Sequence, residues 1–405
     1  MGATYKMIYL DHAATTAVYP EVIREMTPYL HEYYYNPSSS YKEGRLLHKK
    51  LDQIRTVLAG GIHAKPQEII FTSGGTESDN WVLVNAARSL CGKGRHIITS
   101  AIEHHAILHT CHFLENCGFD LTYLPVNREG FVEPAVLEKA IRPDTILISV
   151  MYANNEIGTL QPIRELGQIA QKNSIPFHTD AVQAYAHVPI DVSSTPIDFL
   201  SVSAHKFGGP KGVGFLYAKE GTPLSPLLYG GAQEQGRRAG TENVAGIVGM
   251  GCAAQLSLEH MTEYAGQESS LRDHLMHRIL SEIPMTRLNG SSQKRLPGNL
   301  NVSFYGIDSA TLIAMLETKD IYVSGGSACS SADQAPSHVL HSIGLSDEMA
   351  LGALRITIGH ENTMEEINET LQDKMSAAGS MISQAGQMES SIVGIISGFL
   401  LRNSV

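Results

Sequence analysis

From about residue 66 the chain alternates between short apolar segments and segments with helical spacing. The apolar segments lie at 68–72, 96–100, 121–125, 145–151, 176–180, 199–203 and 212–218. Several are apolar on both faces, as in a mainly parallel sheet with helices on each side. The pattern therefore predicts an α/β fold around a mainly parallel seven-stranded sheet. Ligands of such sheets bind at the carboxyl ends of the strands.

A smaller α+β region is expected after this sheet. A helical stretch at 257–283 leads into strand patterns at 300–304, 322–324 and 354–358. With 405 residues the chain is long enough for two domains. We predict an N-terminal segment at 1–16 that packs with the small domain, a large domain at 17–262, a small domain at 263–380 and a tail at 381–405.

Charge, cysteine usage and apolar runs exclude several classes of protein. The net charge is -11 and there is no long basic run, which disfavours a nucleic-acid-binding role. The five cysteines are scattered, which indicates reduced thiols rather than a disulfide framework. The N-terminus lacks the apolar core of a signal peptide, and the apolar run at 392–401 is too short to span a bilayer. We therefore expect a cytoplasmic enzyme without a membrane or nucleic-acid partner.

A glycine-rich turn follows the first predicted strand. Ser73-Gly74-Gly75-Thr76 opens a helix, and the free N–H groups of a helix start bind phosphate well. The turn is no Walker A loop, because no Gly-Lys-Ser/Thr follows. By itself, an ordinary helix N-terminus explains it equally well.

Three polar residues follow three other strands. Asn155 can donate a hydrogen bond to a ligand oxygen, and Asp180 ends a buried strand, where a carboxylate needs a partner such as a protonated pyridine nitrogen. Lys206 follows the strand at 199–203 and could form a Schiff base with an aldehyde, most often pyridoxal phosphate. Alone, Lys206 reads as a surface lysine, and Lys211 is a second candidate. Together the three residues favour a cofactor site.

The histidines after the second strand allow two interpretations. His105, His109 and His112 share one helical face, as metal ligands could. No His-Glu-x-x-His motif accompanies them, so we predict no metal site and a solvated helix face with one functional histidine.

Two later segments carry further candidates. In the loop before residue 245, Thr241 is either a helix N-cap or a second phosphate contact, and Arg237 and Arg238 suit an anion or a subunit contact. Cys329 lies among small residues, as expected for an exposed thiol in a mobile loop. Arg355 lies inside an apolar strand and needs an anionic partner, such as a substrate carboxylate.

This set of motifs resembles the NifS/IscS group of cysteine desulfurases, which are fold type I, class V aminotransferase-like pyridoxal phosphate enzymes. The resemblance runs from about Ile8 to Glu366 and includes Asp-Ala-Val-Gln, Ser-Ala-His-Lys-Phe-Gly-Gly-Pro-Lys-Gly, Arg-Arg-Ala-Gly-Thr-Glu-Asn and Ser-Ala-Cys-Ser-Ser. The serine-rich cysteine segment resembles the group I enzymes. Gln235 and Gly326 depart from the family pattern, which could alter loop motion or subunit contacts. The tail after about residue 375 departs from it as well, which leaves the protein partner open.

The resemblance implies a role for each site residue. Lys206 would form the Schiff base, His104 would stack on the ring and assist proton transfer, and Cys329 would receive the substrate sulfur as a persulfide. Arg355 and Asn155 would bind the carboxylate of L-cysteine, and Asn155, like Gln183, would also contact the cofactor near its phenolic oxygen. The remaining cofactor contacts would be Gly75, Thr76, Asp180, Gln183, Ser203, His205 and, from the neighbouring subunit of a homodimer, Thr241.

The resemblance also implies the reaction and leaves alternatives open. L-cysteine would become L-alanine, and the persulfide would pass to a sulfur-acceptor or Fe–S scaffold protein, for cluster assembly or tRNA thiolation. A selenocysteine lyase or a class V aminotransferase on the same fold is the nearest alternative. A non-catalytic sulfur-relay scaffold and a metal hydrolase built on the histidines are weaker ones.

Overall fold

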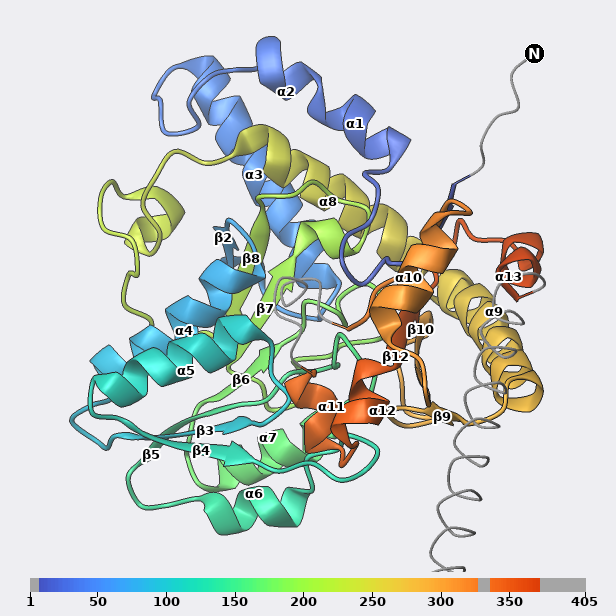
Figure 1. Ribbon diagram of the computed structural model, residues 1–405. Helices are drawn as coiled ribbons and strands as arrows, with labels where there is room; N and C mark the ends of the chain where they lie inside the picture. Colours follow the sequence, from blue (N-terminus) through green and yellow to red (C-terminus); the bar gives the residue numbers. More distant parts are fainter. Residues whose placement is uncertain (1–6, 327–335, 372–405) are drawn as a thin grey trace, which may run out of the picture.

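The fold is described by a computed structural model, which covers residues 7–326 and 336–371 (Figure 1). Its core is a seven-stranded sheet in the order β2-β8-β7-β6-β5-β3-β4. The strands are β2 (Ile69–Thr72), β3 (His96–Ser100), β4 (Asp120–Leu124), β5 (Thr145–Ser149), β6 (Phe177–Asp180), β7 (Phe199–Ser203) and β8 (Gly214–Ala218). Each matches a predicted segment within a few residues. The mainly parallel seven-stranded sheet is therefore confirmed.

Only β8 runs against the direction of its neighbours. It pairs antiparallel with β2 and β7, whereas β7, β6, β5, β3 and β4 pair in parallel. Consequently the carboxyl ends of β2, β3, β5, β6 and β7 face the same edge of the sheet.

Helices cover both faces of this sheet, as the doubly apolar strands require. Ile70 and Ile97 face a cluster with α4 (Gly75–Ser89) and α5 (His105–Asn116). Ile69 and Phe71 face the opposite cluster. The helices of that second cluster are α3 (Lys42–Gly60), α6 (Pro134–Ala140), α7 (Ile163–Lys172) and α8 (Val244–Glu259).

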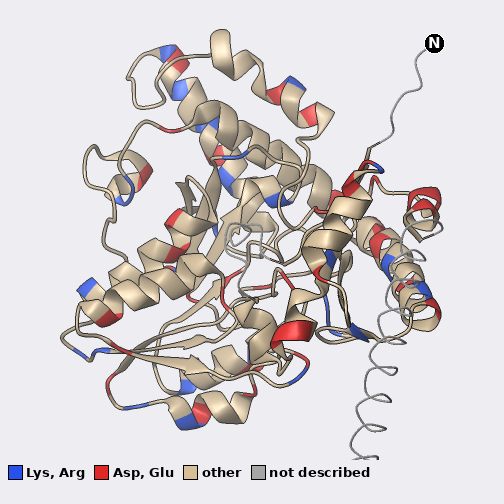
Figure 2. Cartoon of the chain, viewed as in Figure 1, with Lys and Arg blue, Asp and Glu red and all other residues tan. Residues whose placement is uncertain are grey.

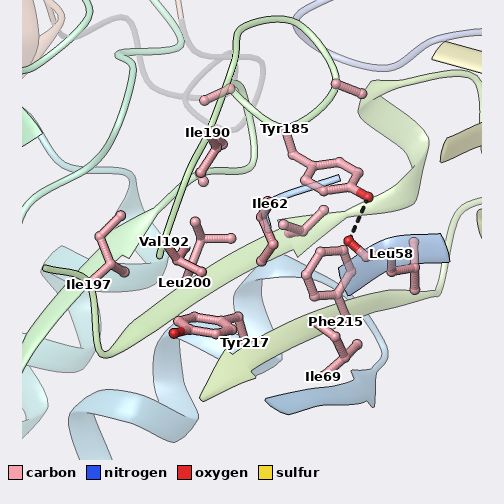
Figure 3. Close-up of a cluster of buried hydrophobic side chains, with 14 of the residues drawn as sticks. Leu58, Ile62, Ile69, Tyr185, Ile190, Val192, Ile197, Leu200, Phe215 and Tyr217 are labelled. Atoms are coloured by element: carbon pink, nitrogen blue, oxygen red, sulfur yellow. Dashed lines mark hydrogen bonds between the residues drawn. The ribbon is translucent and has the colours of Figure 1, made fainter. Parts of the chain in front are cut away.

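Part of the second cluster is drawn in Figure 3. The ring of Tyr185 lies above Phe215, and its hydroxyl donates a 3.3 Å hydrogen bond to the carbonyl of Leu58. Tyr185 is fully buried, so this bond satisfies a hydroxyl that would otherwise destabilise the apolar core.

A second group of elements lies beside the large sheet (Figure 1). It holds β9 (Thr286–Leu288), β10 (Asn299–Phe304) and β12 (Ala353–Thr357) in one antiparallel sheet, and β1 (Ile8–Tyr9) paired with β11 (Ile321–Tyr322). Strand β9 was not predicted. The helices here are α9 (Met261–Glu282), α10 (Ser309–Glu317), α11 (His338–Ser342), α12 (Asp347–Leu351) and α13 (Met364–Thr370).

The N-terminal segment belongs to this second group. Ile8 and Leu10 are buried in the same cluster as Leu275 of α9 and Ile356 of β12. The helices α1 (Pro20–Met26) and α2 (Pro28–His31) lie on the other side, against α8. The residue boundaries given above for the domains remain predictions.

Membrane-spanning and nucleic-acid-binding proteins have characteristic helix lengths and charge distributions. Within residues 7–326 and 336–371, no helix is both long and apolar enough to cross a bilayer. Figure 2 shows Lys and Arg spread over many helices and loops, with Asp and Glu among them. A nucleic-acid site usually gathers basic residues into a stripe or patch.

Candidate active site

A cavity of about 230 Å³ lies at the carboxyl ends of the large sheet. Its lining draws on β6, on β7, on the start of α4, on the N-terminal segment and on β12. Of the predicted site residues, the following line it: Gly75, Thr76, His104, Asn155, Asp180, Gln183, Ser203, His205, Lys206 and Arg355. Ala13 and Arg355, which are 342 residues apart in the sequence, thus line the same cavity.

Lys206 lies on the short turn after β7 and reaches into the cavity. Its Nζ donates hydrogen bonds to the carbonyls of Ala13 at 2.7 Å and Ala14 at 2.8 Å. Its own carbonyl accepts a 2.9 Å bond from His187 Nε2, which fixes the backbone of the turn. Lys211, the other candidate, is exposed at the surface and lines none of this cavity. Geometry thus favours Lys206 as the reactive amine.

Asp180 ends β6 and is buried at one end of the cavity. One carboxylate oxygen, Oδ1, accepts a 2.9 Å bond from the backbone N–H of Val182. Burial raises the pKa of Asp180 to about 6, opposed by that hydrogen bond and by the positive charge of Lys206. A buried carboxylate of this kind is stabilised by a cationic partner within the cavity.

The start of α4 forms another end of the cavity. Gly74 caps the helix at φ 146°, a conformation that favours glycine. A Cβ on Gly75 would lie 2.5 Å from Cγ2 of Val182, so glycine also lets the backbone approach the cavity wall. The first N–H groups of a helix have no intrahelical partner and attract an anion. Ser203 and His205 add side chains to the same wall.

Two histidines of the cavity are held neutral. His104 is the N-cap of α5, where its Nδ1 accepts a 3.1 Å bond from the N–H of Ala106, so the neutral ring carries its proton on Nε2. Burial, with the charge of Lys206, lowers the pKa of His104 to about 4. The same causes lower the pKa of His205 to about 4. Near neutral pH, His104 therefore presents an uncharged ring to the cavity.

Arg355 projects from β12 into the cavity, where a protein anion already pairs with it. Its Nη2 donates to Asp11 Oδ1 at 2.7 Å, and its Nη1 donates to the carbonyl of Asn155 at 3.2 Å. Among the described residues its Nε has no hydrogen-bond partner, although it is buried. The need for an anion was predicted correctly, but Asp11 was missed because it lies 344 residues away in sequence.

One interpretation of Thr241 is wrong. Helix α8 begins at Val244, and its N-cap is Asn243, whose side chain accepts from the N–H of Gly246 at 3.1 Å. Thr241 is exposed and lines none of the cavity within this chain. In the same loop Arg238 makes a bidentate ion pair with Glu77 at 2.9 and 3.0 Å. The anion that Arg238 binds is therefore a side chain of the same protein chain.

The other candidates have different outcomes. Cys329 lies outside the described residues. The rings of His105 and His109 stack at 4.9 Å, while His112 pairs with Glu115. Within the described ranges no group of three or more His, Cys, Asp or Glu is arranged to hold a metal ion.

Sequence reasoning also missed residues of the cavity wall. Asp79, Met151, Ala153 and Val182 line it without a predicted role. Asp79 lies four residues after Gly75 on α4, and this spacing alone would have placed it on the same helix face.

Comparison with known proteins gives consistent results. Residues 8–370 match the family Aminotransferase class-V. The chain is 51% identical over 367 residues to the cysteine desulfurase IscS of Methanosarcina thermophila, covering 91% of each chain. It is 50% identical to the cysteine desulfurase IscS of Dictyoglomus turgidum, covering 90% of this chain and 92% of the relative.

Solved structures agree with this relation. A NifS-like protein superposes with a TM-score of 0.85 at 36% identity, over 95% of this chain and all of its own. The protein SspA in complex with cysteine superposes with a TM-score of 0.78 at 37% identity, over 88% of this chain and all of its own.

Proposed function

The chain belongs to the aminotransferase class-V family and is a cysteine desulfurase, and on that premise we propose how its residues divide the reaction. Pyridoxal phosphate binds in the cavity at Lys206. L-cysteine is converted to L-alanine, and its sulfur passes to Cys329. The observation that carries this proposal is that the amine of Lys206, the carboxylate of Asp180 and the guanidinium of Arg355 line a single cavity.

The lining fits pyridoxal phosphate on chemical grounds. The N-terminus of α4 at Gly75 and Thr76, with Ser203 and His205, offers donors to a phosphate. Asp180, buried and short of a full set of partners, suits a protonated ring nitrogen. When bound, this cofactor supplies an electron-accepting ring that stabilises negative charge on the substrate Cα.

Other residues orient the two molecules. His104 would stack on the cofactor ring, and its neutral state avoids repulsion by the nearby ammonium of Lys206. Gln183 would lie near the phenolic oxygen, and its amide Nε2 already donates a 3.0 Å hydrogen bond to the carbonyl of Ala13. Arg355 would bind the substrate carboxylate through its guanidinium, assisted by Asn155, whose carbonyl already accepts from Nη1.

Lys206 moves the proton at the substrate Cα. Its Nζ donates to the carbonyls of Ala13 and Ala14, and these two acceptors would hold the free amine at the cavity wall. The N-terminal segment and the turn that carries the lysine thus position the base together.

Cys329 then receives the sulfur. Its thiolate attacks the substrate sulfur; the new S–S bond forms as the C–S bond breaks, and the electron pair stays with the carbon skeleton, which takes up a proton and leaves as alanine. L-cysteine and one thiol thus give L-alanine and one persulfide.

A direct assay tests this assignment. Purified protein with L-cysteine and a thiol reductant should release alanine and sulfide in equal amounts. Pyruvate in place of alanine would indicate a cysteine β-lyase, which eliminates sulfide from the substrate. A keto acid that retains the sulfur would indicate an aminotransferase. Either product contradicts the proposal.

The functional unit we propose is a homodimer. Large side chains are exposed over α1, α2, the following loop and the start of α3: Ile23, Leu30, Tyr33, Tyr34, Tyr41 and Leu46. An apolar patch of this kind usually marks a protein interface. In the dimer, the exposed Thr241 reaches the phosphate in the cavity of the neighbouring subunit.

A sulfur-acceptor protein, such as an Fe–S scaffold, receives the persulfide in this proposal, and the cytoplasm is its place of action. The described cysteines Cys91, Cys111, Cys117 and Cys252 are all unpaired, as in a reducing compartment.

A further inference from the structure

A second buried acid lies beside Asp180. Asp79 is on α4, one turn beyond Gly75, and its side chain is 1% exposed. It lines the cavity, yet its Oδ1 has no hydrogen-bond partner among the described residues. A buried polar atom without a partner is costly, so its persistence in the wall of a ligand cavity needs an explanation.

Two strand relationships place Asp79 next to Asp180. His178 and Asp180 are two residues apart on β6, so their side chains lie on the same face of the sheet. Asp79 Oδ1 is 3.6 Å from Nε2 of His178. Ser201, the β7 partner of Asp180 in the strand register, also contacts Asp79. Asp79 therefore lies over β6 and β7 beside Asp180, and both acids line the same cavity.

His178 cannot neutralise either acid. Its Nδ1 is bonded to Ser149 Oγ at 2.8 Å and its Nε2 to Ser201 Oγ at 3.0 Å, two hydroxyls that satisfy a neutral ring. Burial lowers the pKa of His178 to about 3, so the ring stays uncharged near neutral pH. The cation that acts on Asp180 is Lys206.

Two carboxylates in such surroundings do not both ionise. Burial, and then the charge of Asp180, raise the pKa of Asp79 well above its usual value. Asp180 is the better placed to ionise, because the N–H of Val182 and the charge of Lys206 both stabilise its anion.

We propose that Asp79 and Asp180 form one acid pair with a single negative charge, in which Asp79 keeps the proton. Asp79 is a positioning residue: by staying neutral it leaves the charge on Asp180, opposite the ring nitrogen of the cofactor. Asp79 also has a reserve role: when Asp180 is replaced by a neutral residue, Asp79 loses its proton and carries the negative charge instead. This inference rests on the proposed binding of pyridoxal phosphate.

A double-mutant cycle on cofactor affinity tests the pair. The full-length chain, stripped of cofactor, is titrated with pyridoxal phosphate as wild type, Asp79→Asn, Asp180→Asn and the double variant. Asp79→Asn replaces a neutral acid by a neutral amide, so the dissociation constant should change by less than about threefold. In the Asp180→Asn background, Asp79→Asn removes the remaining acid of the pair. The affinity for pyridoxal phosphate should therefore fall by a further factor of about ten or more.

Glu103 provides the matched control. It is as buried as Asp79 and electrostatically linked to Asp180, but it does not line the cavity, and its Oε1 is held by Ser100 and the N–H of Met151. Glu103→Gln should have the same small effect in both backgrounds.

Several outcomes would overturn the acid pair. An equal effect of Asp79→Asn in the two backgrounds excludes the reserve role, and a loss of about tenfold in wild type shows that Asp79 itself carries the charge. Wild type that fails to bind the cofactor refutes the proposed function instead, so the two failures are distinct.

A second measurement does not depend on the cycle. Infrared difference spectra between each variant holoenzyme and wild type should show the loss of one carboxylic acid C=O component in both Asp79→Asn and Asp79→Ser. Glu103 is itself protonated near neutral pH, so Glu103→Gln should remove a different component and leave that of Asp79 in place. If neither Asp79 variant loses an acid component relative to wild type, Asp79 is ionised and the assignment of the proton is wrong. Asp79→Ser serves if the asparagine variant does not fold.

Discussion

Asp11 and the buried Arg355 form a partly buried ion pair that joins the N-terminal segment to β12, with Oδ1 and Nη2 2.7 Å apart. The pair holds the guanidinium at the cavity wall, where its buried Nε has no hydrogen-bond partner among the described residues. The segment before the large sheet therefore shapes the site in two ways: Asp11 orients Arg355, and the carbonyls of Ala13 and Ala14 orient Lys206.

Arg355→Lys should weaken substrate binding. A lysine replaces the planar fork by one point charge and cannot serve Asp11 and a carboxylate in the same geometry. We expect KM for L-cysteine to rise by roughly tenfold to a hundredfold, the loss of about one charged hydrogen bond. Steady-state kinetics measure this.

The control for that variant is Arg295→Lys. Arg295 is equally buried, but it donates to the backbone carbonyls of Ser291, Asn299 and Ile157 and lies outside the cavity. It should lose stability and keep its KM. A normal KM in Arg355→Lys would remove Arg355 from the substrate site.

Lys206→Ala should abolish the yellow absorption of the bound cofactor, because no amine then remains to form the covalent link. The exposed Lys211 supplies the matched control, and Lys211→Ala should keep both colour and activity. Absorption spectra of the purified proteins decide the point. The reverse result would assign the link to Lys211.

Cys329→Ala should keep the cofactor and lose sulfide release, since sulfur transfer needs a thiolate but cofactor binding does not. Cys91, an exposed unpaired cysteine on the described part of the chain, is the control, and Cys91→Ala should stay active. Sulfide production in Cys329→Ala at the wild-type rate would refute the persulfide assignment.

Glu103 should make stability depend on pH with a definite sign. Burial raises its pKa to about 8, so between pH 4.5 and 8 the folded protein keeps a proton that the unfolded chain releases. Its contribution to the free energy of unfolding therefore falls as pH rises through this window, by at most about 1.4 kcal/mol per pH unit.

Glu103→Gln removes that contribution. The difference in stability between the variant and wild type should shift in favour of the variant from pH 5 to pH 8, as measured by urea unfolding at several pH values. A difference that is constant with pH would mean that Glu103 is ionised in the folded protein.

The patch on α1 and α2 should control assembly. Leu30 is 68% exposed there, and Leu30→Asp places a charge in the proposed interface. We expect dissociation to monomers in light scattering and weaker cofactor binding, because Thr241 then no longer reaches the neighbouring cavity. Phe113→Asp, at a site on α5 that is also well exposed (57%), should remain dimeric. A dimeric Leu30→Asp would place the interface elsewhere.

The sequence by itself determined the large sheet and most of the residues around the cavity. Doubly apolar segments have few ways to be buried, so the strands were predicted within a few residues, and parallel strands bring their ends together. This is why Lys206, Asp180 and Asn155, far apart in the chain, could be assigned to one site.

Only the tertiary structure decided which groups complete that site. Three sets of contacts join distant segments of the chain. Asp11 pairs with Arg355, the carbonyls of Ala13 and Ala14 accept from Lys206, and Asp79 contacts His178 of β6. A local pattern carries no record of such contacts, because they arise when separate cores pack together. The N-cap at Asn243 was decided by backbone geometry in the same way, since Thr241 and Asn243 are both good capping residues.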